Sequence, residues 1–384
     1  MILPKKLIRF FYVAACVSAL GLTASALAET LTPAVATDLL EAYELLEEEK
    51  TPEALAALNR LMERRGERMT PFDRASVLQI RGSAHVNEDN LQAALQDFEE
   101  AINLAALPEE QQNRLRFNMA QLYFVTEQYE KSIAFFEAWM AEDPDVDSNT
   151  YFMLAGAHYQ LKQYPDSLDA ISKAIELSDE AVRRHYDLKN VLLSELEYVP
   201  ERTELLEEMV VIWPNELSFW RQLSSLYLQQ GEELKAFGSL ESAYLSDLVE
   251  DEADILVLAQ FYSSFNNPYR GARLIEREME NERVERSVDN LELLSQLWSQ
   301  SREHREAIPI LREAAQKAET GDLFFRLGQA YLATEDNQAA ENAFEQALDK
   351  GSLEDNLADT WILLGNARFN QAGPGDRQQP ADLG

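Results

Sequence analysis

The sequence is short of the residues on which most catalytic and metal sites depend. Its 384 residues include one cysteine, Cys16, and four histidines, His85, His158, His185 and His304. A single thiol rules out a disulfide within the chain and a multi-cysteine zinc site. No two histidines stand at metal-ligand spacing, and no glycine-rich phosphate loop interrupts the chain. We therefore expect no cofactor, no metal and no catalytic residues.

Basic residues are also scarce, with 34 Lys and Arg against 68 Asp and Glu and a net charge of −34. Nucleic acid is disfavoured as a partner because phosphate binding needs a basic face. An anionic membrane surface is disfavoured for the same reason. A basic, extended partner would instead be attracted by the long-range field. The alternative interpretation is that the acidity only keeps the protein in solution.

The first 28 residues predict a cleavable signal peptide. Three basic residues open it, residues 10–22 form an apolar core, and residues 26–28 form a small-residue cleavage site. The apolar stretch is too short and wrongly flanked for a membrane span. We expect export to the periplasm, which would leave a mature chain with no cysteine and a charge of −37, from 31 basic and 68 acidic residues. The alternative is a lipid anchor at Cys16, against which the apolar residues that follow it argue.

A small residue recurs ten times along the chain at spacings of 33 to 40 residues, and we call its place the small position. It is occupied by Ala42, Gly82, Ala120, Ala155, Asn190, Ser224, Ala259, Ser295, Gly328 and Gly365. Sixteen residues later stand nine apolar residues, Leu58, Phe98, Phe136, Ile171, Leu206, Leu240, Ile275, Leu311 and Phe344. Twelve residues later the side chain is small in all copies but one, and three residues later it is often aromatic or His. Such a period predicts a stacked helical array with an extended binding surface.

The clearest copy, residues 323–351, shows how each repeat folds. Its first segment has one apolar face with spacings of three and four, which predicts a helix. After a break at residues 335–337, a second helix is indicated by Ala340, Phe344 and Ala347. Gly328 and Ala340 are small because two antiparallel helices must approach closely there, and Gly351 is expected to end the second helix.

These residues resemble the tetratricopeptide repeat, whose signature includes Leu-Gly, Tyr, Ala, Phe and Ala at these spacings. The resemblance covers residues 37–370 and is weakest around Asn190, where Lys189 and Arg202 replace Leu and Ala; a distorted joint is expected there. It implies an all-α, right-handed superhelical solenoid over residues 29–372. About nine helix-turn-helix pairs and a C-terminal capping helix would form it, followed by a flexible tail at residues 373–384.

The family places its first helices along a concave groove, with residues −6, −3, +1, +4 and +5 from the small position pointing inward. This implies a partner-binding groove formed by Arg114, Phe117, Gln121, Phe124, Val125, Asn149, Phe152, Tyr159, Arg184, Asp187, Arg221 and Leu228. Four aromatic rings flanked by Arg and amides have the chemistry of binding hot spots. The alternative is that neighbouring repeats cover the rings.

A calcium loop is a weaker interpretation of the alternating residues Asp143, Asp145, Asp147 and Asn149. The glycine at the sixth position and the closing glutamate are both missing. We therefore expect a turn between repeats, with Asp residues capping the next helix.

Residues 58–84 are similar to exported repeat proteins that accompany TonB systems, in which the ExbB/ExbD motor energises TonB. The resemblance implies a non-catalytic periplasmic scaffold, an accessory of TonB-dependent transport that holds an extended segment rich in Pro and Lys. One alternative is a scaffold for outer-membrane or cell-wall assembly. Another is a hydrolase or carrier with a site in the groove, which would need a convergent set of His, Asp or Ser that the sequence does not show.

Overall fold

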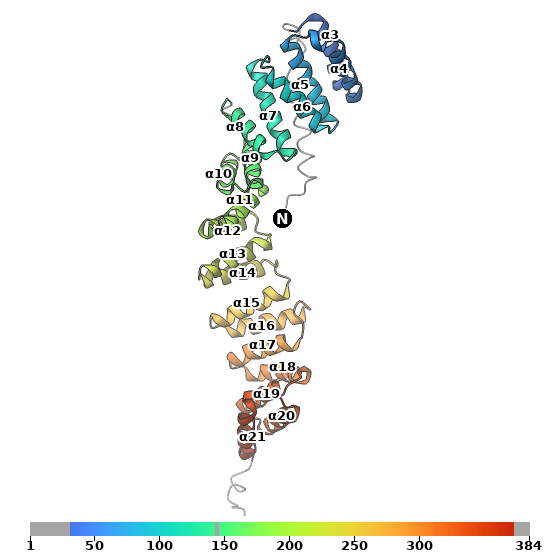
Figure 1. Ribbon diagram of the computed structural model, residues 1–384. Coiled ribbons are helices and arrows are strands. Elements are labelled where there is room, and N and C mark those ends of the chain that lie inside the picture. The colour runs from blue at the N-terminus through green and yellow to red at the C-terminus, as the bar shows by residue number, and fades with distance from the viewer. Residues whose placement is uncertain (1–30, 143–145, 372–384) are drawn as a thin grey trace, which may run out of the picture. The chain divides into compact units, whose positions relative to one another are not determined.

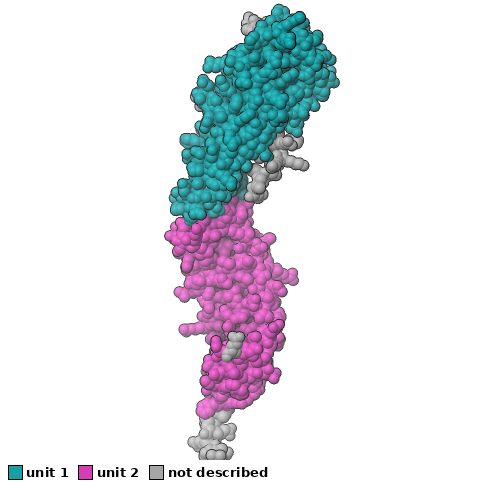
Figure 2. Space-filling view, in the orientation of Figure 1, with its two compact units in different colours: residues 1–205 teal, residues 206–384 magenta. Residues whose placement is uncertain are grey.

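The computed structural model describes residues 31–142 and 146–371, and these form helices and turns without a strand. The chain divides into two compact units, residues 1–205 and 206–384 (Figure 2). The predicted signal peptide with Cys16, the tail, and Asp143 and Asp145 lie outside the described residues.

The first unit consists of helices that follow one another along the chain (Figure 1). They are α3 (Pro33–Glu47), α4 (Thr51–Arg65), the 3-10 turn η1 (Gly66–Arg68), α5 (Pro71–Asn87), α6 (Leu91–Asn103), α7 (Glu109–Val125), α8 (Tyr129–Met140), α9 (Ser148–Gln160), α10 (Tyr164–Glu176), α11 (Arg183–Glu195) and the first half of α12 (Val199–Ile212). From α3 to α11 each helix packs on the next. Asp147 accepts a hydrogen bond from the Thr150 amide at 2.7 Å, which confirms an Asp cap on α9.

The second unit repeats the same arrangement. It contains α13 (Leu217–Gln229), α14 (Glu233–Leu245), α15 (Glu252–Ser264), α16 (Pro268–Glu280), α17 (Val288–Gln300), α18 (His304–Lys317), α19 (Asp322–Ala333), α20 (Asn337–Lys350), the 3-10 turn η2 (Glu354–Asn356) and α21 (Leu357–Gln371). Again each helix packs on the next. Over the described residues of both units, the 19 helices are nine pairs and a final helix, which confirms the predicted all-α repeat fold.

The pairs close through contacts at the small position. A Cβ built on Gly328 would lie 2.5 Å from the Phe344 ring, and one on Gly271 would lie 2.7 Å from the Ala259 carbonyl oxygen. The nine apolar residues sixteen positions after the small position are all buried, none more than 4% exposed. The expectation that Gly328 is small because two helices approach closely there is therefore confirmed.

In several pairs, a serine side chain forms a hydrogen bond between the two closely packed helices. The hydroxyls of Ser132 and Ser167, twelve residues after the small position, donate to the carbonyl oxygens of Ala120 and Ala155 at 2.8 and 2.7 Å. A serine at this position stays small and satisfies a buried carbonyl, so the two helices are joined as well as packed.

The pair formed by α11 and α12 departs from this pattern. Asn190 stands at the small position, and its Oδ1 accepts a hydrogen bond from Arg202 Nε at 2.8 Å. Arg202, one of the two residues that made this copy weak in the sequence, therefore bonds to the residue at the small position. The division between the two units also falls within α12.

The turn inside every pair has the same backbone conformation. The residue seven positions after the small position has a φ between 56° and 75° in all nine pairs. These residues are Glu49, Asp89, Glu127, Lys162, Glu197, Gly231, Asn266, Arg302 and Glu335. Only one of them is glycine, the residue that adopts this region without strain. Gly351, at φ 75°, ends α20 as expected.

Candidate functional site

The predicted groove residues on α7 are held in place by neighbours. Arg114 forms an ion pair with Glu110 at 2.8 Å, one helical turn away. The half-buried Phe117 ring lies 4.6 Å from Trp139 and 6.1 Å from Phe136, both on α8. The side chain of Gln121 is only 5% exposed.

The second ring on α7, Phe124, also packs against neighbouring helices. It meets Tyr129 of α8 edge-on at 5.7 Å, and a Cβ on Gly156 of α9 would lie 3.2 Å from it. Phe124 and the neighbouring Val125 are both half-buried. The α7 rings therefore contribute to packing and leave only part of their surface for a partner.

Three predicted residues from α9 and α11 come together on one surface. The guanidinium of Arg184 lies 4.9 Å from the centre of the Phe152 ring, and its Nη2 donates to Asn149 Oδ1 at 3.2 Å. We call Asn149, Phe152 and Arg184 the Arg184 cluster. Arg184 is exposed, and no carboxylate in the described part of the chain forms an ion pair with it. The ring and the amide thus hold a cation whose charge is available to a partner.

A buried histidine lies behind this cluster. The His185 ring is 5.0 Å from Phe152, and the residue is 1% exposed. Burial, with a smaller contribution from the charge of Arg184, lowers the pKa of His185 to about 4. The imidazole is therefore neutral at physiological pH, and its buried Nε2 has no hydrogen-bond partner among the described residues.

Two serines near His185 do not form a nucleophile–base pair. Ser148 and Ser178 both donate to the Ala174 carbonyl at 2.7 Å, and they contact each other at 2.7 Å. The separation of Ser178 Oγ from His185 Nδ1 is 3.4 Å. A nucleophilic serine donates its proton to a base, whereas these two hydroxyls donate hydrogen bonds to a backbone carbonyl oxygen. The group joins α9, α10 and the start of α11.

The remaining predicted residues of the first unit have local partners. Tyr159 packs against Tyr164 at 5.8 Å, and burial followed by the charge of Glu195 raises its pKa. Asp187 accepts a hydrogen bond from Arg183 at 2.9 Å. Neither joins the Arg184 cluster through a contact that the structure shows.

In the second unit, the predicted Arg221 lies between two carboxylates. Its Nε donates to Asp254 at 2.6 Å, and Nη2 also contacts Asp251, both at the start of α15. These bonds neutralise its charge and tie α13 to α15. Leu228 is 46% exposed and offers apolar surface.

The second unit also carries a column of amides that was not predicted from the sequence. Gln260, Gln296 and Gln329 all stand one residue after the small position, as Gln121 does in the first unit. Gln260 and Gln329 are exposed. An amide both donates and accepts, so such a column suits the backbone of an extended peptide. The repeated Gln at one register position is the signal that identifies it.

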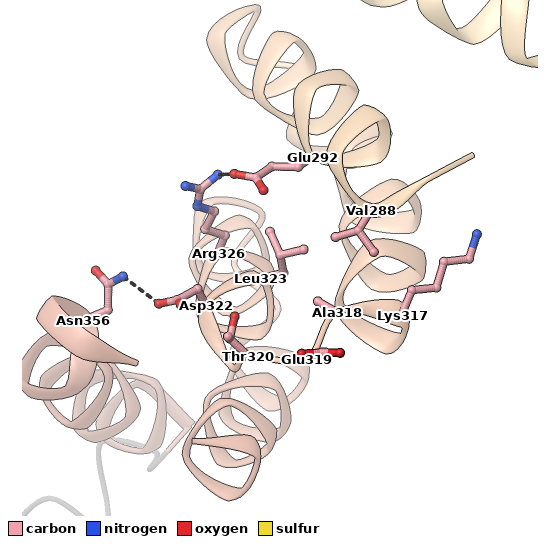
Figure 3. A pocket seen from close by; sticks show the side chains of 10 residues that line it. All are labelled: Val288, Glu292, Lys317, Ala318, Glu319, Thr320, Asp322, Leu323, Arg326 and Asn356. Carbon is pink, nitrogen blue, oxygen red and sulfur yellow. Dashed lines mark hydrogen bonds and ion pairs between the residues drawn. The ribbon is translucent and has the colours of Figure 1, made fainter. Parts of the chain in front are cut away.

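A hollow of about 550 Å³ lies beside α17 and α19 (Figure 3). Arg326 donates to Glu292 at 2.7 Å, and Asn356 donates to Asp322 at 3.0 Å along its wall. Lys317, also in the wall, pairs with Glu313 at 2.9 Å. Arg326, Asp322 and Lys317 in this lining are already paired, and no His, Cys or Ser is among its ten lining residues.

Within the described residues, no three His, Cys, Asp or Glu side chains gather in a way that would hold a metal ion. None of the helices described is both long enough and apolar enough to cross a membrane.

Residues 321–349 match the family model of the tetratricopeptide repeat. The protein contains a tetratricopeptide repeat. This tetratricopeptide repeat comprises α19 and α20, the pair closed by Gly328 against Phe344. The other eight pairs share its left-handed turn residue and its buried apolar residue sixteen positions after the small position.

Several solved structures are similar to the chain, and two of those described here are of tetratricopeptide repeat proteins. A tetratricopeptide repeat protein from Parabacteroides merdae is 14% identical, covers 88% of this chain and 100% of its own, and has a TM-score of 0.39. The C-terminal part of a protein from Cytophaga hutchinsonii is 15% identical over 65% of this chain and 99% of its own, with a TM-score of 0.36. MamA from Desulfovibrio magneticus is 16% identical over 57% and 97%, with a TM-score of 0.33. A search of curated proteins found no match.

Proposed function

We propose that this protein is a non-catalytic scaffold that binds an extended segment of another protein along its first helices. The Arg184 cluster carries this proposal. It presents an exposed cation, an aromatic ring and an amide at positions where a repeat solenoid receives its partner. Repeat folds supply such surfaces because each unit adds one more pair of helices to a continuous face.

The partner we propose is basic overall and extended. The net charge of −34 attracts such a chain over long range. At close range, the guanidinium of Arg184 can donate to the partner's backbone carbonyls, and the exposed part of Phe152 can pack against its apolar groups. Two other predicted cations, Arg114 and Arg221, are already neutralised by carboxylates and do not repel a basic chain.

We further propose that the protein works in the periplasm as an accessory of TonB-dependent transport. The predicted signal peptide and the similarity of residues 58–84 to exported TonB-associated repeat proteins support this role. TonB's extended periplasmic segment, rich in Pro and Lys, has the charge and the conformation that the acidic scaffold would select. The scaffold would act by holding one component near another and so raising its local concentration.

The test is a crosslinked pull-down from periplasm that compares the wild-type protein with Arg184→Ala. A matched control is Arg305→Ala, which removes an exposed Arg on α18, outside the first helices. We expect TonB, ExbD or a receptor to be enriched by wild type and control and lost with Arg184→Ala. If all three proteins captured the same partner equally, the binding site would not include the Arg184 cluster.

Affinity for a synthetic Pro- and Lys-rich TonB segment gives a second readout. Loss of an exposed cation–π and hydrogen-bonding group should weaken binding roughly 5- to 30-fold, the equivalent of about 1–2 kcal/mol. Binding should also weaken as salt rises, because exposed charges are screened over about 8 Å at physiological ionic strength. Capture of cell-wall or outer-membrane assembly proteins instead would keep the scaffold and discard the TonB pathway. Turnover abolished by one groove substitution would favour the hydrolase alternative.

A further inference from the structure

The final helix, α21, exposes more large apolar side chains than any other helix in the described residues. Leu357, Trp361, Ile362 and Phe369 are 51%, 58%, 60% and 60% exposed. On its opposite face, Leu364 and Ala367 are buried against α20, so the helix covers the end of the core as predicted. In doing so it presents a new apolar face. Exposed apolar surface concentrated in this way marks an interaction site.

Two complete pairs, α7–α8 and α19–α20, show what side chains at these positions can contact. At position −3, Phe117 and Phe325 pack on the second helix of their own pair, through Phe136 and Phe344, each at 6.1 Å. At position +4, Phe124 packs on Tyr129 of its own second helix. The equivalent positions on α21 are Ile362 and Phe369, with Gly365 between them at the small position.

The space beside Gly365 is open, because no atom lies within 4 Å of where its Cβ would be. At Gly328 the same place is filled by Phe344. The exposed face of α21 therefore corresponds to the face that a second helix covers in the α7–α8 and α19–α20 pairs. It fits an apolar helix that approaches closely at the glycine.

The composition of residues 372–384 does not favour such a helix. Residues 372–384 contain Gly373, Pro374, Gly375 and Pro380, which disfavour a helix, and only one bulky apolar residue, Leu383. They cannot supply the small-and-large apolar pattern that the second helices of the complete pairs present.

Charge favours a second copy of this chain as the occupant. With a net charge of −34, two copies repel each other across most surfaces. Helix α21 carries only two charged residues, Asp359 and Arg368, and Arg368 is bonded to Glu341 and Glu345 at 2.7 and 2.6 Å. Its apolar face is thus the place where two copies can meet without opposing like charges.

We propose that the protein forms a two-fold symmetric dimer through α21, with the two helices packed antiparallel. Gly365 lies midway between Trp361 and Phe369, four residues from each. An antiparallel pairing centred on Gly365 places each Trp361 against Phe369 of the partner subunit, and the two glycines allow close approach. Such a face is complementary to itself, as a two-fold interface requires.

The proposed interface is small, and its area sets the dissociation constant that we expect for the dimer. An aromatic side chain buries about 150–250 Å² in full, and the two rings with Ile362 form most of each half. The total falls at the low end of specific interfaces, near or below about 1,200 Å². We therefore expect a reversible dimer with a Kd in the micromolar range.

Sedimentation velocity of the full chain over a range of concentrations tests the dimer. Wild type should shift from monomer to dimer, and the Trp361→Ser/Ile362→Ser variant should associate at least tenfold more weakly. The control is Leu245→Ser, which removes a side chain that is 75% exposed on α14. It should dimerise as wild type does. Circular dichroism establishes that all three proteins keep their helices. A wild-type monomer at every concentration, or a dimer unaffected by the double variant, would overturn the proposal.

Crosslinking tests the two-fold arrangement directly. In a Cys16→Ser background, Gly365→Cys places one thiol near the proposed axis in each copy, whereas Leu245→Cys places it elsewhere. Oxidation should give a disulfide-linked dimer with Gly365→Cys and little with Leu245→Cys. If Gly365→Cys stays monomeric while wild type dimerises, the copies meet through another surface and the proposal is wrong.

Discussion

The phenol of Tyr262 donates a hydrogen bond to Glu241 Oε1 at 2.6 Å. Tyr262 stands three residues after its small position, and Glu241 stands seventeen residues after the preceding one. The same register joins neighbouring pairs at four other places, Tyr123 with Glu99, Tyr227 with Glu207, Tyr331 with Arg312, and Arg368 with Glu345. At these five places, a polar contact between the same two positions of the repeat therefore links one helix pair to the next.

We expect Tyr262→Phe to destabilise the protein by about 1–2 kcal/mol, because the ring stays packed but Glu241 loses a donor. Burial and Glu241 raise the pKa of Tyr262 to about 12, so the phenol keeps its proton at physiological pH. Urea unfolding measures the change. Tyr269→Phe is the control, since that residue is 50% exposed and its hydroxyl forms no hydrogen bond with the residues that the structure describes. It should cost less than about 0.5 kcal/mol; equal losses would mean that the hydrogen bond contributes nothing.

Gly231 and Gly238 should respond in opposite directions to alanine. Gly231 has a φ of 75°, which a Cβ disfavours by about 1 kcal/mol, so Gly231→Ala should lower the free energy of unfolding by that amount. Gly238 lies inside α14 with nothing within 4 Å of its Cβ position, so Gly238→Ala should stabilise by up to about 1 kcal/mol. Thermal unfolding of both variants checks the pair. If both alanine variants were more stable than the wild type, the left-handed backbone conformation at Gly231 would be contradicted.

The sequence predicted the helix pairs because close packing leaves a compositional trace. Gly328 is small because Phe344 fills the space beside it, and this relation recurs through the small and apolar positions. The turn residues left no such trace, since glutamate and lysine occupy a conformation usually given to glycine. Nor did the Tyr262–Glu241 contact, because it links two repeats and depends on how they stack.

The three residues of the Arg184 cluster could be named from the sequence, but their contacts with one another could not. Asn149, Phe152 and Arg184 were all expected on the groove, but their mutual contacts depend on the packing of α11 on α9. The rings of Phe117 and Phe124 share the same register and are nevertheless partly covered by α8. A helical register fixes the direction of a side chain, whereas its exposure depends on the size of its neighbours.

Stability should fall as the pH is lowered from about 6.5 to about 4, because of His185. Its pKa is lowered to about 4 in the folded protein, so the unfolded chain, with a pKa near 6.5, takes up the proton first. The stabilisation is complete above about pH 6.5 and lost by about pH 4, roughly 3 kcal/mol in all. Urea unfolding at several pH values should show a smaller decrease for His185→Gln. If His185→Gln lost as much stability as the wild type over this pH range, other titratable groups would be responsible for the loss.

A second loss should follow at lower pH because of Glu313. Hydrogen bonds from Arg286 and then Lys317 lower the pKa of this carboxyl to about 2. Its stabilising effect is present above the ordinary pKa of about 4.5 and disappears as the pH falls toward 2. Because the side chain is 32% exposed, solvent screening limits the effect to about 1 kcal/mol or less. Glu313→Gln should flatten the pH dependence in this window, whereas Glu319→Gln, the matched exposed control, should not.

The scaffold proposal is tested most directly by site-specific photocrosslinking in cells that make the protein. A photoreactive residue at Val191, which is 37% exposed on the first helix α11 one residue after its small position, should capture a discrete protein partner. The same residue at Leu245, on the second helix α14, should not. Adding Arg184→Ala should remove the Val191 product. Equal capture at both positions, or a Val191 product that Arg184→Ala leaves unchanged, would contradict binding at the Arg184 cluster.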